Sequence, residues 1–170
     1  MTQQSFKDNV FVHKDKLFRF ARRFLVSEDE AFDVVQDIMV KLWHKKDELS
    51  TIENIEAYAM RMVNNECINR LRKFETREAY KNNYTANQST ENYYEELKPI
   101  ILNYINQLPD KQRAVIHLRD VEEYEMKEIA EMLSMEETAV RVNLTRARQK
   151  VKTQLNTFLS NETRRLKIIS

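Results

Sequence analysis

The side chains best suited to bind a charged ligand lie near the C-terminus, where arginine and lysine recur between residues 141 and 152. Residues 137–170 contain eight basic and two acidic residues, a net charge of +6, whereas residues 99–136 contain four basic and eight acidic residues. The whole chain carries only +1. Guanidinium and ammonium groups at this density attract phosphate, but a basic helical face can also be merely solvated. Charge alone therefore leaves both interpretations open.

Two predicted helices would position these basic side chains. Apolar residues recur at helical spacing at Val140, Leu144, Ala147, Val151 and Leu155, and before them at Met126, Ile129, Ala130 and Leu133. A small residue, Ala130, at the crossing point and a short interruption at residues 134–136 are typical of a helix-turn-helix. Many such turns contain glycine. Because serine tolerates positive φ poorly, we expect the Ser134 hydroxyl to close this turn.

The apolar stripe of the second helix leaves a polar surface that suits DNA. In a major groove, Arg141, Val142 and Thr145 would approach base edges, while Arg146 and Arg148 would reach phosphates or guanine. The small residue, the short turn and the reversal of charge together favour DNA over a solvated basic face. The predicted DNA-binding surface consists of Thr138, Arg141, Val142, Asn143, Thr145, Arg146 and Arg148.

Three further helices are predicted in the N-terminal half. The first has apolar residues at helical spacing between Leu17 and Leu25, the second follows a capping box at residues 27–30 and runs to about Lys46, and the third spans residues 55–74. In the second helix, Asp33, Gln36 and Asp37 lie at i, i+3 and i+4 on one face. Such a face can dock on a partner or simply contact solvent.

The third helix carries a polar stripe of its own, made of Arg61, Asn65, Asn69 and Arg72. Asparagine offers both a donor and an acceptor to an exposed base, and the arginines can hold phosphates. Single-stranded DNA is therefore a reasonable ligand for this stripe. A polar outer face without a ligand fits the same residues equally well.

The composition favours an all-α fold made of two small helical domains. The 170 residues include no glycine and two prolines, which excludes phosphate-binding loops, dinucleotide fingerprints and nucleophile elbows. Residues 75–96 contain no Val, Ile, Leu, Met, Phe or Trp, and so they cannot build a core. We predict an N-terminal domain at residues 1–74, a flexible linker at residues 75–98 and a C-terminal domain containing the helix-turn-helix at residues 99–170.

The sequence offers no constellation for catalysis or metal binding. His13, His44 and His117 are scattered without carboxylate or cysteine partners at metal spacing, and nothing near Cys67 would activate its thiol. We therefore expect no enzymatic activity, no metal and no cofactor. No apolar stretch is long enough to cross a membrane and no signal peptide is visible, so we expect a cytoplasmic protein without membrane insertion.

Beyond these patterns, the sequence resembles the extracytoplasmic-function (ECF) sigma factors, the compact two-domain initiation factors of bacterial RNA polymerase. The resemblance covers nearly everything from Leu17 to Leu155. It depends on the motifs Ala31-Phe32-Asp33-Val34-Val35-Gln36-Asp37, Lys41-Leu42-Trp43, Leu118-Arg119-Asp120-Val121, Glu128-Ile129-Ala130-Glu131 and Leu144-Thr145-Arg146-Ala147-Arg148. It implies core RNA polymerase and promoter DNA as partners, and an anti-sigma factor that holds the protein inactive.

The resemblance also implies roles for the three polar surfaces. In that family, the helix with Asp33, Gln36 and Asp37 docks on a coiled coil of the largest polymerase subunits. The third helix and the preceding loop at residues 47–54 capture flipped bases of the minus-ten element, with Asn65 at a base-contacting position, and the helix-turn-helix reads the minus-thirty-five element. The sequence departs from the family at Leu49, Asn143 and Thr145, so the promoter sequence is not predictable. Glycines common near Glu123 and in the turn are also absent, so we expect atypical helix ends.

Two other functions are compatible with the residues. A one-component transcriptional regulator would carry the same helix-turn-helix beside an N-terminal domain that senses a ligand or dimerises, and it would not co-elute with core polymerase. An α-helical interaction module would not use DNA at all. Replacing Arg141 and Arg146 with alanine would leave every binding activity of such a module intact.

Overall fold

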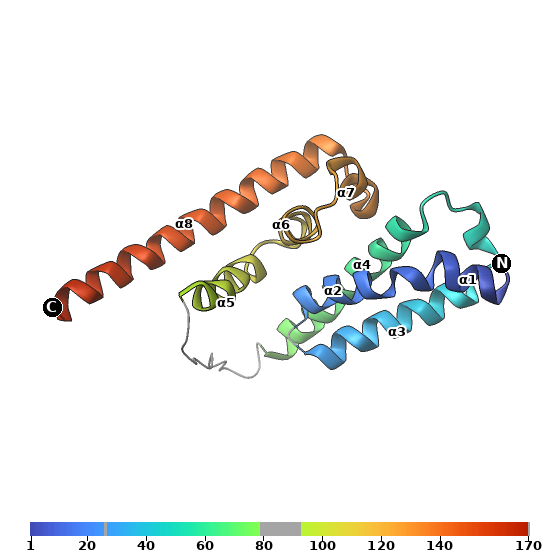
Figure 1. Cartoon of the computed structure of the whole chain (residues 1–170), viewed down its shortest axis with the longest axis horizontal. Helices are drawn as coiled ribbons and strands as arrows, with labels where there is room; N and C mark the ends of the chain where they lie inside the picture. Colours follow the sequence, from blue (N-terminus) through green and yellow to red (C-terminus); the bar gives the residue numbers. More distant parts are fainter. Residues whose placement is uncertain (26, 79–92, 170) are drawn as a thin grey trace.

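The computed structural model describes the backbone of residues 1–25, 27–78 and 93–169, and the side chains of residues 1–25, 27–73 and 97–161. Within these ranges the regular structure is helical, as expected from the composition. Figure 1 shows two groups of helices, which we call the N-terminal unit (α1 to α4) and the C-terminal unit (α5 to α8).

The N-terminal unit packs α2, α3 and α4 around a core of aliphatic and aromatic side chains. Its elements are α1 (Gln3–Asn9), a 3-10 turn (Phe11–His13), α2 (Lys14–Phe24), α3 (Glu28–His44), a second 3-10 turn (Glu48–Thr51) and α4 (Ile55–Glu78). Ser27 caps α3 as predicted, because its side-chain oxygen accepts from the Glu30 N–H at 3.4 Å. Asn54 caps α4 in the same way, accepting from the Ala57 N–H at 2.9 Å. These caps satisfy N–H groups that have no partner within their own helix.

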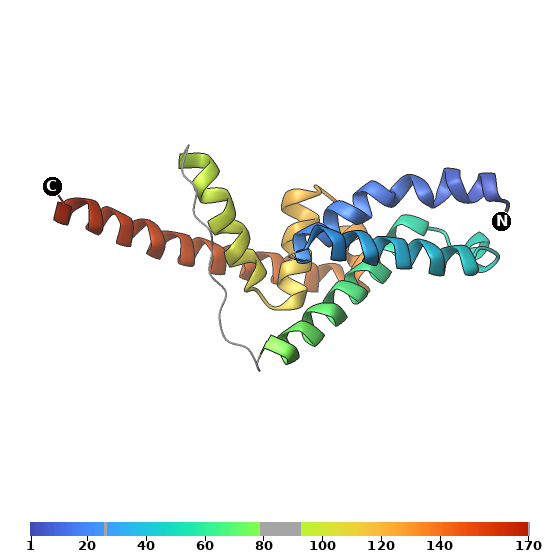
Figure 2. The same ribbon diagram turned by 90° about the horizontal axis from the view of Figure 1, so that it is seen from below.

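The C-terminal unit comprises α5 (Tyr93–Asn106), α6 (Asp110–Ile116), a π-helical turn (His117–Val121), α7 (Met126–Leu133) and α8 (Glu137–Ile169). A capping box starts α7, where Glu125 and Glu128 bond reciprocally to each other's backbone N–H groups. α8 is long enough to run beside α6 and α5 and to extend beyond them, as Figures 1 and 2 show. α6 and α8 share the core of this unit, with Val115, Leu144 and Ala147 buried.

The turn between α7 and α8 closes through the backbone, and our expectation of closure by the serine hydroxyl was wrong. Ser134 adopts the left-handed conformation, with φ 51° and ψ 50°. The Met135 N–H then donates to the Ala130 carbonyl at 2.9 Å, which is the six-to-one bond of a Schellman motif. Glu123 is the other residue with positive φ, at 61°, in the part of the chain that the structure describes. Both are positions where the sequence lacks an expected glycine.

The helices extend further than the apolar patterns predicted. α4 continues four residues past Phe74 to Glu78, and α5 begins at Tyr93. Helices therefore occupy both ends of the segment from 75 to 98, while residues 79–92 lie outside the described residues. Once packing in the core has formed the first turns of a helix, each further residue adds a backbone hydrogen bond at low cost. Polar residues with good helix propensity, such as glutamate and arginine, can therefore continue the helix beyond the core.

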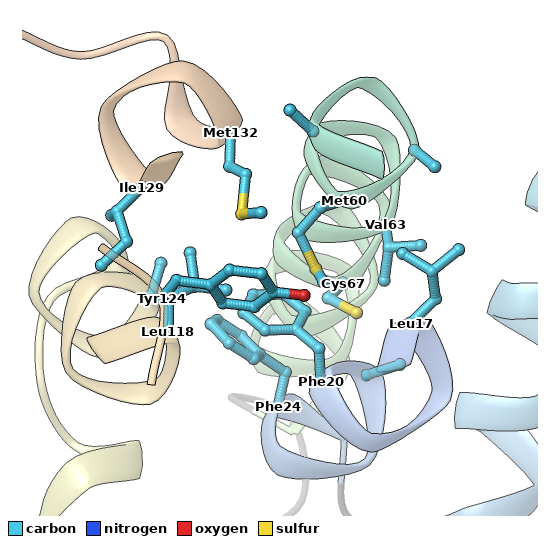
Figure 3. Close-up of a cluster of buried hydrophobic side chains, with 14 of the residues drawn as sticks. Leu17, Phe20, Phe24, Met60, Val63, Cys67, Leu118, Tyr124, Ile129 and Met132 are labelled. Atoms are coloured by element: carbon cyan, nitrogen blue, oxygen red, sulfur yellow. The ribbon is translucent and has the colours of Figure 1, made fainter. Parts of the chain in front are cut away.

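The two units bury apolar side chains against each other, which the sequence did not predict. Figure 3 shows Phe20 and Phe24 of α2 and Met60 of α4 facing Leu118, Tyr124 and Met132 of the C-terminal unit. The Phe24 and His117 rings lie 5.4 Å apart, and the Arg113 guanidinium lies 5.0 Å from the centre of the Phe24 ring. α4 and α7 pack directly on each other. The cores of the two units are thus continuous.

Candidate nucleic-acid and protein interfaces

The helix-turn-helix predicted from the C-terminal sequence is formed by α7 and α8. Ile129, Val140, Leu144 and Ala147 are all buried between the two helices and α6, whereas Ala130 is half-buried. This packing fixes the orientation of α8 and leaves its opposite face to solvent. The polar face of α8 is therefore available to a ligand at its N-terminal half.

Most of the predicted DNA-binding side chains of α8 lie on that exposed face. Thr138, Arg141, Val142, Thr145, Arg146 and Arg148 are exposed, and Val142 retains 46% of its accessible area although it is apolar. Arg141 bonds to Glu137 one turn earlier. The structure thus brings the predicted residues together on one helix face.

Two of the predicted side chains are tied to other groups of the C-terminal unit. The Arg148 guanidinium donates to both carboxylate oxygens of Asp120, at 3.0 and 2.5 Å, and this hydrogen bonding raises the pKa of Arg148. Asn143 is half-buried and donates from its amide to the Ala139 carbonyl at 2.8 Å. Both residues therefore contribute to the structure of this unit. Asp120 was not distinguished by the sequence as the partner of Arg148.

The polar stripe of α4 is only partly open. Asn65 and Asn69 are exposed, as the helical pattern predicted. Arg61 is half-buried and donates to the backbone carbonyls of Glu131 and Met132, at 2.5 and 3.4 Å. Arg72 donates to the Asp110 carboxylate at 3.1 Å. Both arginines of the stripe therefore contact the C-terminal unit.

Two side chains of the segment before α4, those of Leu49 and Asn54, make contacts within the folded chain. Leu49 is 1% exposed, because the 3-10 turn from Glu48 to Thr51 directs it into the core of the N-terminal unit. The side-chain amide of Asn54 donates to the Glu131 carboxylate at 2.9 Å while its oxygen caps α4. Leu49 is therefore closed to a ligand, and both polar groups of the half-buried Asn54 side chain are already bonded.

The polar stripe of α3 faces solvent beside an apolar patch. Asp33, Gln36 and Asp37 are all exposed, and Asp37 accepts from Arg70 of α4 at 2.9 Å. Phe32 and Val40 on the same helix keep 48% and 51% of their accessible area. Next to them a cleft of about 410 Å³ opens between α2 and α3, and its lining includes Phe11, Phe18, Phe32 and Gln36. This apolar patch was not predicted. Its signal in the sequence is the outward position of Phe32 and Val40 on a helix that buries most of its other apolar residues.

A charged cluster at the boundary of the two units was also missed. Glu56 accepts from the Tyr124 hydroxyl at 2.5 Å and from Lys16 at 2.8 Å, and it lies 3.4 Å from His13. Arg19 pairs with Glu122 at 3.1 Å. Burial opposes ionisation of Glu56, but the bonds from Lys16 and Tyr124 outweigh it and lower the pKa of this carboxyl. The partners are 40 to 103 residues apart in sequence, so no local pattern could reveal them.

Cys67 is a buried residue of the core around α4. Burial raises the pKa of the Cys67 thiol to about 12, so the thiol does not form a thiolate readily. Among the described residues, no group of three or more His, Cys, Asp or Glu side chains is arranged to hold a metal ion. None of the helices in the described part of the chain is sufficiently long and apolar to cross a membrane.

Comparison with known proteins identifies relatives along most of the chain. The description "Sigma-70 region 2" matches residues 12–78, and "Sigma-70, region 4" matches residues 99–151. The ECF RNA polymerase sigma factor SigW of Bacillus subtilis is 26% identical over 168 residues, covering 90% of both chains. The RNA polymerase sigma-E factor of Streptomyces avermitilis is 27% identical, covering 88% of this chain and 84% of its own.

Solved structures show the same fold. The sigma factor RpoE in complex with the anti-sigma factor NepR, from Bartonella quintana, superposes with a TM-score of 0.68 at 20% identity, over 90% of this chain and 98% of its own. CnrH in complex with the cytosolic domain of CnrY gives a TM-score of 0.70 at 24% identity, over 92% of this chain and 90% of its own.

Proposed function

Because the chain belongs to the ECF sigma factors of the sigma-70 family, which direct RNA polymerase to promoters, we propose how its surfaces divide that task. The C-terminal unit binds duplex DNA upstream through α8. The N-terminal unit binds core polymerase through α3 and melted DNA through α4. No covalent chemistry is involved.

The observation that carries this proposal is the exposed polar face of α8 above a buried apolar stripe. The buried side of α8 packs on the rest of the unit through Val140, Leu144 and Ala147. On the opposite side, Arg141 and Arg146 extend into solvent. A helix presented in this way fits the major groove, where arginine can bond to guanine or phosphate. The exposed Val142 suits an apolar contact such as a thymine methyl group. We assign this face to the minus-thirty-five element.

Asn65 and Asn69 of α4 are the side chains that we assign to the melted minus-ten element. Both amides are exposed and lie one turn apart on the helix. An amide can bond to the Watson–Crick edge of an unpaired base, and Arg61 and Arg72 at either side can neutralise phosphates. Capture of unpaired bases stabilises the open strand and so lowers the free energy of melting.

Polymerase docking is assigned to α3 and the apolar patch beside it. Asp33 and Gln36 provide polar specificity, and Phe32 and Val40 provide apolar area that would otherwise remain in water. A patch of this kind, rimmed by polar side chains, marks a protein interface. An anti-sigma factor is the second protein partner that we propose, since the RpoE and CnrH structures contain NepR and CnrY. It would act by covering the surfaces that bind polymerase and DNA.

The test is run-off transcription with core polymerase on a library of genomic fragments. We expect promoter-dependent products with the wild-type chain. Asn65→Ala with Asn69→Ala should lose these products but still co-elute with core polymerase, whereas Asn103→Ala, an exposed asparagine of α5, should behave as wild type. If the wild-type chain gives no promoter-dependent product, or if it fails to co-elute with polymerase while shifting a palindromic duplex, a one-component regulator replaces this proposal.

A further inference from the structure

Gln149 lies in the middle of the exposed face of α8, among the side chains that we assigned to DNA. It is exposed, and it is two residues away from each of the buried Ala147 and Val151. Because successive residues of an α-helix are about 100° apart, Gln149 extends away from the buried stripe. Figure 1 shows α5, α6 and α7 on the other side of α8. The Gln149 side chain therefore starts from the part of the helix that can face a DNA groove.

Gln149 carries a side-chain amide, which can donate and accept hydrogen bonds at the same time. Within the described part of the chain, this amide has no hydrogen-bond partner, although the Thr153 hydroxyl donates to the Gln149 backbone carbonyl at 2.9 Å. The side chains of Asn143 and Thr145 differ, because each donates to a backbone carbonyl one turn earlier, at 2.8 and 3.0 Å. The amide of Gln149 is therefore available to a ligand.

Basic side chains lie along both edges of this exposed face. One edge has Arg146 and Lys150, and the other has Arg141, Arg148 and Lys152, all of them exposed. The major groove is about 12 Å wide and admits one α-helix, so a helix in it has a phosphate backbone on either side. The two basic edges would meet the phosphates of the two strands. The side chains between the edges would then meet the base pairs.

Val142 and Gln149 lie along one line in the middle of this face. They are seven residues apart in sequence, which is about two helical turns or roughly 10.5 Å. Successive base pairs of DNA are about 3.4 Å apart, so the two side chains would contact base pairs about three steps apart. Val142 suits a thymine methyl group. The amide of Gln149 suits adenine, which presents the N6 amino donor and the N7 acceptor in the major groove.

We propose that Gln149 reads an adenine of the upstream promoter element through two hydrogen bonds, about three base pairs from the base that Val142 contacts. Gln149 is then a further specificity-determining residue of α8, and the element that this helix reads includes one more base pair. This inference rests on the proposed function of α8, because a base contact requires that the helix lies in the major groove.

Base preference can be measured with the full chain bound to core polymerase and a pool of duplexes of random sequence. Duplexes selected by the wild type should share an upstream element with a preferred adenine. Gln149→Ala should reduce the preference for this adenine roughly tenfold and leave the other positions unchanged, because a bidentate contact discriminates only at its own base pair. Gln107→Ala is the matched control, since it makes the same substitution at an exposed glutamine after α5. It should select the wild-type element.

Three outcomes would contradict the proposal in different ways. An upstream element that is the same for wild type and Gln149→Ala would overturn the base contact. Weaker preference at every upstream position of the Gln149→Ala element would overturn it as well, because Gln149 would then act on the whole helix. If the wild-type complex selects no upstream element, the DNA-binding function of α8 fails, and the Gln149 contact fails with it.

Replacing the selected adenine with 7-deazaadenine tests the contact at a single atom, since this analogue keeps the N6 amino group but has carbon in place of N7. In titrations with the polymerase complex, wild type and Gln107→Ala should bind the modified duplex roughly fivefold more weakly than the unmodified one. Gln149→Ala should bind both duplexes equally, because its contact with N7 is already missing. An equal loss in wild type and Gln149→Ala would overturn the assignment of N7 to Gln149.

Discussion

At the scale of single residues, two turns of the C-terminal unit adopt a backbone conformation that ordinarily uses glycine. Glu123 and Ser134 have φ of 61° and 51°, although the chain contains no glycine anywhere. A side chain with a Cβ is disfavoured there by roughly 1 kcal/mol relative to glycine. The sequence indicated where these turns fall, but their conformation depends on the backbone bonds that close them.

We expect Ser134→Gly to stabilise the protein by about 1 kcal/mol, because glycine removes the steric cost of the left-handed conformation. Urea denaturation followed by circular dichroism would measure the free energy of unfolding. Ser160→Gly is the control, since Ser160 lies inside α8, where glycine should destabilise by roughly 0.5–1 kcal/mol. A destabilising effect of glycine at both positions would contradict the left-handed turn.

His117 makes the stability of the protein dependent on pH. The side chain is fully buried, and both ring nitrogens lack a hydrogen-bond partner. Burial, together with the nearby charges of Arg23 and Arg113, lowers the pKa of His117 from 6.5 to about 3. The unfolded chain therefore takes up a proton below pH 6.5 that the folded chain does not. The stability that the neutral ring contributes to the folded state is fully present above pH 6.5, and it is lost as the pH falls below 6.5.

Lowering the pH from 7.5 to 5.5 should cost about 1.4 kcal/mol of stability through this residue alone. His117→Phe keeps an aromatic ring beside Phe24 but cannot take up a proton. Between pH 7.5 and 5.5, the free energy of unfolding of this variant should therefore fall by about 1.4 kcal/mol less than that of the wild type. Urea denaturation of both proteins at the two pH values gives the comparison. Parallel losses in wild type and variant would show that His117 is not buried as a neutral ring.

At the scale of secondary-structure elements, apolar periodicity predicted α2, α3, α4, α7 and α8 because each buries one stripe of its surface. It did not predict α1 or the ends of α4, where polar residues continue a helix without a buried stripe. The candidate site on α8 followed from the same periodicity, since the residues left outside the stripe are the ones that we propose bind DNA. The pairing of Arg148 with Asp120 spans 28 residues, and it could not be seen in any local pattern.

The arginines of α8 should therefore differ in their roles. We propose that the exposed Arg146 side chain binds phosphate, so Arg146→Ala should weaken binding to promoter duplex. The slope of log affinity against log salt concentration should become shallower by about 1. The melting temperature of the protein should not change. Arg148→Ala also leaves Asp120 without its bidentate partner, and should lower stability by less than about 1 kcal/mol, since the pair is partly exposed. Anisotropy titrations at several salt concentrations, paired with thermal melts, separate the two effects. Identical profiles for both variants would refute the distinction.

At the scale of the whole molecule, the sequence divided the chain into two units but did not show how they meet. Helical periodicity assigns an inner face to each helix without naming the helix that covers it. Tyr124 lies among glutamates in sequence, yet it is buried and bonds to Glu56 of α4. His117 is a polar residue, yet it is buried against Phe24 of α2. Their burial depends on a partner surface nearly a hundred residues away along the chain. An expectation of two separate domains joined by a linker therefore missed the continuous core.

The continuous core predicts that damage at the boundary reaches both units. Phe24 belongs to α2 and is 2% exposed, and its ring contacts His117 and Arg113 of the C-terminal unit. Phe24→Ala should cost about 3–5 kcal/mol. It should also increase amide hydrogen exchange in α6 as well as in α2, because both helices lose packing at the boundary. Phe6→Ala removes a ring that packs on Trp43, within the N-terminal unit, and should affect α6 much less. If exchange in α6 of the Phe24→Ala variant stays unchanged while exchange in α2 and α3 becomes faster, the two units fold independently and the boundary contributes no stability to the C-terminal unit.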